Sequence, residues 1–193
     1  MDLHLADARV HWHRRWLERS AADALFSTLH ADVAWEVHRI RMFGRQVDSP
    51  RLSCWMGDAD AGYRYSGTDF VPAPWHPALL PLRDRLADFC GASFNSVLLN
   101  RYRDGADAMG WHRDNEPELG PAPLIASLSL GAERRFLLRR YDDHGRKAEV
   151  ALGHGDLLLM GGATQTYYQH ALPRTVRPVG ERINLTFRWI SPR

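Results

Sequence analysis

The sequence predicts a mostly β fold with flanking helices, and three observations support this. After Gly91 the chain becomes a series of short apolar runs separated by Gly, Pro and Asp, which is typical of closely spaced strands. Before Gly91 two segments carry apolar residues at helical spacing. The 15 Gly and 11 Pro suit many tight turns. Strands of this kind form a sandwich, a barrel or a jelly roll.

Two helices are expected in the first part of the chain. The first is predicted between Trp12 and His30, with its apolar residues at Trp16, Leu17, Ala21, Ala24, Leu25 and Leu29. The second is predicted from Pro77 to Phe89, because proline suits a first helical turn and Gly91 can end the helix. Residues 31–40 have extended character, and residues 41–67 are rich in turns and aromatics.

The strands are expected where apolar runs recur after Gly91. The runs are 97–99, 124–130, 136–138, 150–152, 157–160 and 183–190. The chain of 193 residues contains no repeat and no low-complexity linker, so we expect a single domain.

Composition excludes several classes of protein. The net charge of +2 does not by itself call for a polyanionic partner, although arginines gather at 39–51 and 134–147. Solvated surface charge is the alternative for both groups. Cys54 and Cys90 lie in unrelated contexts and indicate neither a disulfide framework nor a zinc site. No signal peptide or membrane span is recognisable, so we expect a cytoplasmic protein without membrane contact.

The combination of His112, Asp114 and His170 predicts a metal site. In a strand, residues i and i+2 point to one face, so His112 and Asp114 can share a cavity at a strand end. His170 follows an aromatic stretch where a neighbouring strand can return to the same place. Two imidazoles and a carboxylate bind non-haem Fe(II) on one face and leave the other open. An exposed pair in a turn is the alternative for His112 and Asp114 alone.

Other histidines lack such partners. His11 and His13 share strand spacing but lie in a helical pattern, so we interpret them as surface residues. His144 and His154 lie beside glycines in predicted turns, where we expect them to be solvated.

The segment from Arg182 to Arg188 predicts an anion site. The two arginines are six positions apart and face one side of a strand, with Asn184 and Thr186 between them. A guanidinium matches a carboxylate bidentately. A metal with open positions and an anion clamp together indicate an Fe(II)/2-oxoglutarate dioxygenase. Asn100 and Tyr102 form a second polar pair at strand spacing, for which a capped strand end is the alternative.

These motifs resemble the AlkB family of Fe(II)/2-oxoglutarate nucleic-acid demethylases, and most closely its animal branch for double-stranded DNA repair. The resemblance extends from about residue 35 to 190. The similar stretches are 42–44, 63–67, 74–75, 95–102, 104–105, 110–116, 123–131, 170–173 and 182–188. The segments Gly110 to Glu116 and Arg182 to Arg188 are highly specific in combination.

The resemblance implies a double-stranded β-helix (jelly-roll) core over residues 93–193 and a helical, nucleotide-recognition front part over 1–92. It implies Fe(II) bound by His112, Asp114 and His170, with 2-oxoglutarate and molecular oxygen as co-substrates. The far carboxylate of 2-oxoglutarate would pair with Arg182, helped by Tyr102, Asn100 and Asn184. Arg188 would lie between the co-substrate and the target base.

The resemblance also implies contacts to a flipped base. Tyr63 and Tyr65 would line or stack on the base, and Glu116 would contact its exocyclic amino group. Phe43 would fill the gap left in the duplex. The alternatives are an aromatic pair that covers the core, a solvent-facing acid and a locally packed loop residue, respectively.

The implied activity is direct reversal of DNA damage by oxidative demethylation of 1-methyladenine and 3-methylcytosine. It is coupled to conversion of 2-oxoglutarate to succinate and releases formaldehyde. The implied partner is alkylated DNA or RNA, and we expect a monomer. The alternatives are a dioxygenase acting on RNA, tRNA, protein or a small molecule, a metal-binding module without turnover, and a protein that only holds lesions.

Two segments depart from the family pattern. Residues Thr166 to Gln169, before the distal histidine, lack the His- and Trp-rich sequence of the animal relatives. This leaves the contacts around the metal open. The segment from Arg45 to Arg51 differs as well, which leaves the handling of duplex DNA open.

Overall fold

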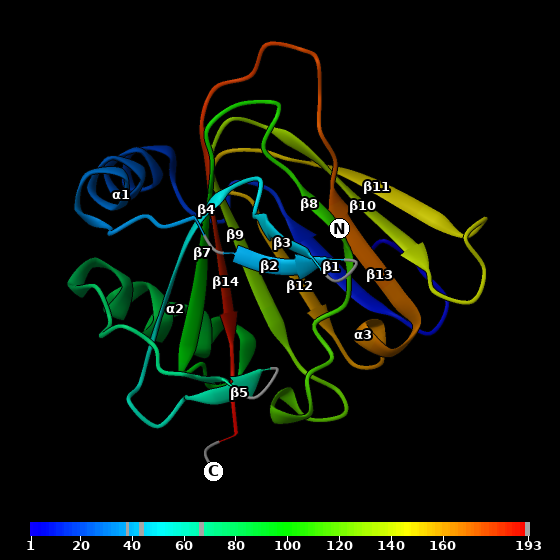
Figure 1. Ribbon diagram of the computed structural model, residues 1–193. Coiled ribbons are helices and arrows are strands. Elements are labelled where there is room, and N and C mark those ends of the chain that lie inside the picture. Colours follow the sequence, from blue (N-terminus) through cyan, green and yellow to red (C-terminus); the bar gives the residue numbers. More distant parts are fainter. Residues whose placement is uncertain (38, 43–44, 66–67, 192–193) are drawn as a thin grey trace.

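Two antiparallel sheets face each other in the protein (Figure 1). The computed structural model describes residues 1–37, 39–42, 45–65 and 68–191, and the side chains of 39–42, 45–47, 63–65 and 68–70 lie outside this description. The larger sheet has the strand order β1-β12-β9-β14-β7-β4, and the smaller has the order β11-β10-β13-β8. The mostly β class and the jelly-roll core are therefore confirmed.

The strands of the larger sheet are β1 (Arg9–His13), β4 (Leu52–Gly57), β7 (Ser96–Tyr102), β9 (Ile125–Gly131), β12 (Leu157–Gly161) and β14 (Arg182–Arg188). The smaller sheet contains β8 (Met109–His112), β10 (Arg134–Arg140), β11 (Lys147–Leu152) and β13 (Tyr168–Leu172). Two hairpins pair β2 (Arg39–Met42) with β3 (Arg45–Asp48) and β5 (Tyr63–Tyr65) with β6 (Thr68–Phe70). The helices are α1 (Arg19–Asp32), α2 (Leu80–Cys90), α3 (Thr164–Tyr167), η1 (Pro77–Leu79) and η2 (Pro117–Leu119).

The second predicted helix is confirmed. Its first turn is the 3₁₀ turn η1, which begins at Pro77 and continues into α2. Gly91 ends α2 in the left-handed conformation at φ 61°, which glycine adopts without steric cost.

The prediction for the first helix was wrong at its start. Residues Arg9–His13 form strand β1, which pairs with β12, and α1 begins only at Arg19. His11 and His13 therefore lie in a strand. The cause is a long-range anchor: Asp156 accepts hydrogen bonds from the Trp12 indole at 3.0 Å and from the Arg15 backbone at 2.8 Å. A local apolar pattern does not reveal such a partner.

Two apolar clusters divide the core. The first lies where α1 and α2 cover the outer side of the larger sheet, and it includes Leu29, Leu86, Leu128 and Phe187. The second lies between the sheets and includes Ile125, Leu138, Leu152 and Leu158. Burying side chains of this size supplies about 1.5–3 kcal/mol each, so both clusters stabilise the sandwich.

Strands from both parts of the chain build the larger sheet. β1 and β4, which precede residue 92, occupy its two edges, and β7, β9, β12 and β14 lie between them. The front part expected over residues 1–92 and the core expected over 93–193 therefore do not form separate layers, because both contribute strands to the larger sheet. Among the residues that the structure describes, no helix is long and apolar enough to cross a membrane.

A candidate metal centre beside a buried anion site

The predicted metal ligands come together between the sheets. His112 ends β8 and His170 lies opposite it on β13, with their ring centroids 4.2 Å apart. Asp114 follows two residues after His112, and its carboxylate lies 4.0 Å from Nε2 of His112 and 3.9 Å from Nε2 of His170. One donor atom from each residue falls within 4.8 Å of the others. The three side chains therefore converge on one point.

The surroundings of the two imidazoles favour metal binding in different ways. Nδ1 of His112 lies 2.9 Å from the Gly110 carbonyl, so we assign its proton to Nδ1 and a free lone pair to Nε2. Burial lowers the pKa of His170 to about 3, and His112 acts in the same direction. The ring of His170 can therefore offer a neutral nitrogen to a cation at physiological pH.

Asp114 is a buried carboxylate that stays ionised. Burial by itself raises its pKa, but Arg188 and the two histidines outweigh burial and lower that pKa to about 2. Arg188 donates to Oδ1 at 2.9 Å, whereas Oδ2 is buried with no hydrogen-bond partner among the described residues. An unsatisfied carboxylate oxygen facing two imidazoles fits a divalent metal, because the metal would supply the missing partner.

The residues of the predicted anion site lie together on one face of β14, as expected. Arg182, Asn184, Thr186 and Arg188 line one cavity of about 40 Å³ together with the three metal ligands. The alternate residues Ile183, Leu185 and Phe187 pack in the apolar cluster beneath the helices. The two-residue period of β14 thus separates a polar inner face from an apolar outer face.

Arg182 is buried and has no carboxylate partner among the described residues. It is 1% exposed, and its Nη2 donates to Ser129 Oγ at 2.9 Å and to Asn184 Oδ1 at 2.7 Å. Its Nε and Nη1 have no hydrogen-bond partner among the described residues. Burial lowers the pKa of Arg182 to about 10, although Tyr102 opposes this shift. The side chain is still cationic at neutral pH, so an anion bound in this cavity would compensate its charge.

Tyr102 and Asn100 lie beside Arg182 on the neighbouring strand β7. Register pairs Arg182 with Tyr102 and Asn184 with Asn100, and both β7 residues line the cavity. Oδ1 of Asn100 accepts a hydrogen bond from Nε of Arg51 at 2.7 Å, which leaves the amide nitrogen free to donate elsewhere. In the sequence Arg51 appeared only as one member of a basic group. The structure shows that it contacts Asn100 in a partly buried position.

The residues predicted to contact the base are less completely described. Phe43 and the side chains of Tyr63 and Tyr65 lie outside the described residues, although Tyr63 and Tyr65 themselves form β5. Glu116 is half-buried and precedes η2, and it is not among the residues that line the cavity. Burial raises the pKa of Glu116, and the nearby charge of Asp114 acts in the same direction.

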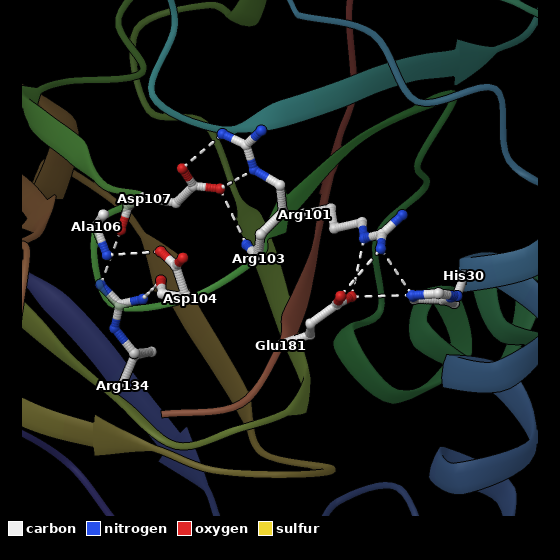
Figure 2. A network of polar contacts seen from close by, with 8 residues as sticks. All are labelled: His30, Arg101, Arg103, Asp104, Ala106, Asp107, Arg134 and Glu181. Atoms are coloured by element: carbon white, nitrogen blue, oxygen red, sulfur yellow. Dashed lines mark hydrogen bonds and ion pairs between the residues drawn. The ribbon is translucent and has the colours of Figure 1, made fainter. Parts of the chain in front are cut away.

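The later arginine group is mostly committed within the protein. Figure 2 shows the Arg134 guanidinium among the backbone groups of the loop after β7, and it donates to the carbonyls of Asp104 and Asp107 at 2.9 Å each. Arg135 pairs with Glu149, and Arg140 pairs with Asp7 and Asp142. Arg146 pairs with Asp143. Clustering in sequence therefore did not indicate a free basic surface, because carboxylates pair with three of these arginines and backbone carbonyls accept hydrogen bonds from Arg134.

Two further residues differ from the expectation or were not foreseen. His154 was expected in solvent, but it is half-buried, accepts from the Gly131 backbone at 2.8 Å and lies 3.1 Å from Asp23. Gln165, on α3, is 2% exposed and accepts a hydrogen bond from the backbone of Asp114 at 3.0 Å. Its position five residues before His170 indicated only that it lies near the metal site, and did not indicate its contact with Asp114.

Comparisons with known proteins agree with this site. Residues 9–188 match the 2OG-Fe(II) oxygenase superfamily. The chain is 40% identical over 184 residues to mouse "DNA oxidative demethylase ALKBH2", covering 90% of this chain and 77% of that protein. It is 40% identical over 186 residues to bovine "Alpha-ketoglutarate-dependent dioxygenase alkB homolog 3", covering 92% and 64%. The structure of OsALKBH1 superimposes with a TM-score of 0.63 over 93% of this chain and 96% of that chain, and its 17% identity speaks for the fold alone.

A jelly roll with this metal and anion geometry defines an Fe(II)/2-oxoglutarate-dependent dioxygenase. The chain belongs to the 2OG-Fe(II) oxygenase superfamily and, by its identity to these relatives, to the AlkB family within it. The predicted cofactors, Fe(II), 2-oxoglutarate and molecular oxygen, are those of this superfamily, and His112, Asp114 and His170 fit the iron.

Proposed function

We propose that this protein repairs alkylated DNA by oxidative demethylation of N-methylated bases such as 1-methyladenine and 3-methylcytosine. The observation that carries the proposal is one cavity that holds both a His-Asp-His cluster and the Arg182 guanidinium, two of whose nitrogens lack hydrogen-bond partners among the described residues. Support comes from the mouse relative that is 40% identical to this chain and is named "DNA oxidative demethylase ALKBH2". RNA is an alternative substrate, and the experiment below distinguishes it.

The residues would divide the work as follows. His112, Asp114 and His170 would hold Fe(II), which with 2-oxoglutarate and oxygen supplies the oxidant for an N-methyl C–H bond. Arg182 would bind the far carboxylate of 2-oxoglutarate, because it is a buried cation in the cavity with two nitrogens that lack hydrogen-bond partners among the described residues. Tyr102, Asn100 and Asn184 line the same cavity and would orient that carboxylate.

Arg188 would position the metal carboxylate as well as the substrates. Its Nη2 bonds Oδ1 of Asp114 at 2.9 Å, while its Nε is buried with no hydrogen-bond partner among the described residues. One guanidinium can therefore hold Asp114 and present a second donor to a bound ligand. This arrangement suits a position between the co-substrate and the target base.

Other residues would contact the target base. A methylated adenine or cytosine carries a positive charge, and the half-buried Glu116 would favour that charge when ionised. Tyr63 and Tyr65 would stack on the extruded base, and Phe43 would take its place in the duplex. Damaged pairs are opened at lower cost than intact pairs, which favours selection of lesions.

The test is single-turnover demethylation read by mass spectrometry. Protein reconstituted anaerobically with Fe(II) receives 2-oxoglutarate, oxygen and an oligonucleotide that contains one 1-methyladenine. Loss of one methylene mass that requires 2-oxoglutarate supports the proposal, and parallel reactions on duplex DNA, single-stranded DNA and RNA identify the substrate form. Succinate without any change in oligonucleotide mass would refute the proposed substrate while keeping the dioxygenase. The expectations of a monomer and of a cytoplasmic location stay predictions.

A further inference from the structure

The loop that carries Asp114 depends on a contact from a distant segment. Asp114 lies beyond the end of β8 and before η2, so it is outside regular structure. Asp114 is nonetheless only 5% exposed, and its carboxylate lies beside both histidines. The backbone N–H of Asp114 donates to Oε1 of Gln165 at 3.0 Å. A side chain on α3 thus fixes the main chain at the metal carboxylate.

The amide of Gln165 can adopt only one useful orientation. Gln165 is 2% exposed, and its Nε2 lies 3.8 Å from Sδ of Met160, a weak acceptor that also lines the cavity. The opposite orientation would place the amide NH₂ against the N–H of Asp114, leaving two donors face to face in a buried site. Oε1 therefore points to Asp114, and the surrounding residues hold it there.

The segment that contains Gln165 is itself firmly placed. Thr164 Oγ1 donates to the Gly161 carbonyl at 2.6 Å, which attaches α3 to the end of β12. Arg113 Nη1 donates to the Thr166 carbonyl at 3.2 Å, a second link between α3 and the metal loop. β13 then begins at Tyr168 and carries His170. One short stretch thus supplies a metal ligand and holds the loop of another.

We propose that Gln165 is a positioning residue of the iron site. It holds the backbone of Asp114 so that the carboxylate faces His112 and His170 before metal arrives. Removing its acceptor oxygen leaves the buried N–H of Asp114 unsatisfied and lets the loop move. Outer residues of this kind typically change metal affinity about 10- to 100-fold. The inference rests on the iron site of the proposed function.

The test uses Gln165→Met, which keeps side-chain length and volume but lacks the oxygen. The matched control is Gln169→Met, which removes an equivalent amide one residue from His170, where Gln169 accepts from Arg139 at 3.1 Å. Co(II) serves as the probe, because its affinity can be measured by calorimetry and its visible spectrum reports ligand geometry. Melting temperatures of the metal-free proteins report stability separately.

We expect Gln165→Met to weaken Co(II) binding about 10-fold or more and to alter the Co(II) spectrum, while Gln169→Met changes affinity less than about 3-fold. Co(II) affinity and spectrum of Gln165→Met equal to wild type would overturn the inference, as would equal losses in both variants. If Gln165→Met does not fold, the same titration is made on Gln165→Asn, whose shorter amide falls short of the N–H; wild-type affinity there overturns the inference. Failure of the wild-type protein to bind Co(II) would instead refute the iron site itself.

Discussion

At the scale of single residues, Arg182 shows how a binding group is maintained at a cost to folding. A guanidinium that is 1% exposed, with two of its nitrogens lacking partners among the described residues, has given up its hydration without full compensation. A bound carboxylate would restore that loss. The same residue should therefore be unfavourable in the free protein and favourable in the complex.

We expect Arg182→Met to leave the metal-free, ligand-free protein as stable as wild type or up to about 4 kcal/mol more stable, because an apolar side chain replaces a buried unpaired charge. Affinity for 2-oxoglutarate should fall by at least about 100-fold, because a charge-assisted contact is lost. Urea unfolding and titration with 2-oxoglutarate under anaerobic conditions measure the two effects. A large loss of stability together with intact 2-oxoglutarate binding would show that Arg182 is a structural residue.

Asp114 gives the corresponding prediction for the metal. Asp114→Ala should abolish turnover and metal binding, because it removes the only carboxylate of the ligand set. Binding of an oligonucleotide containing the lesion should remain measurable, since the base contacts lie elsewhere. Fluorescence anisotropy with the lesion oligonucleotide and the mass-spectrometric assay separate these effects. Demethylation by Asp114→Ala would disprove the ligand assignment.

At the scale of elements, strands with a strict two-residue period were the most predictable. β14 was recognisable because its polar and apolar residues alternate, and β9 because its apolar run is bounded by turn residues. β1 was not, since its partner β12 lies nearly 150 residues away and its own pattern also suits a helix. Local periodicity identifies an amphipathic segment, whereas long-range pairing decides which element it becomes.

The anchor of β1 can be tested directly. Asp156 is 4% exposed and accepts from Trp12, Arg15 and the Gly153 backbone. Asp156→Asn offers one acceptor oxygen in place of two, so we expect a loss of about 1–3 kcal/mol in the free energy of unfolding. Chemical denaturation gives this value, and Co(II) affinity should not change. A change in Co(II) affinity as large as that in stability would contradict a purely structural role.

The loop after β7 yields a prediction that depends on pH. Asp107 accepts from the Arg103 side chain at 2.8 and 2.9 Å and from its backbone at 3.0 Å (Figure 2). Burial alone raises the pKa of Asp107, but these bonds to Arg103 outweigh it and the pKa is lowered. Because the folded pKa is depressed, the stabilisation is complete above the unfolded pKa of about 4 and is lost as pH falls through the folded value.

Asp107→Asn should therefore destabilise the protein by about 1–3 kcal/mol at pH 7, and the difference from wild type should shrink below about pH 4. Urea unfolding of both proteins at pH 7 and pH 3 measures it. A difference of the same size at both pH values would show that packing, and not ionisation, is responsible.

At the scale of the whole molecule, the metal triad and the anion clamp could be predicted because their residues recur at strand spacing. Contacts between segments could not. Gln165, Arg51 and Arg134 act on partners about 50, 49 and 30 residues away, and nothing in their own neighbourhoods distinguishes them from surface residues.

The position of the cavity also predicts how ligands affect stability. Arg182 comes from the larger sheet and two metal ligands come from the smaller one, so bound metal and 2-oxoglutarate would connect the two sheets. At about 100 times its dissociation constant a ligand should add about 2.7 kcal/mol to the free energy of unfolding. Thermal melting with Co(II) and 2-oxoglutarate tests this. An unchanged melting temperature at saturation by both ligands would mean that they also bind the unfolded chain.

The two faces of β14 link the stability of the fold to the integrity of the binding site. β14 pairs with β7 over seven positions and with β9 over six, so a shift of one residue would break both registers. The shift would also turn Arg182 and its inner-face neighbours into the apolar cluster and expose Leu185 and Phe187 between the sheets. A chain with this shifted register would thus have a lower free energy of unfolding and would also lack the binding pocket. Quality control that removes unstable chains would therefore also remove inactive ones.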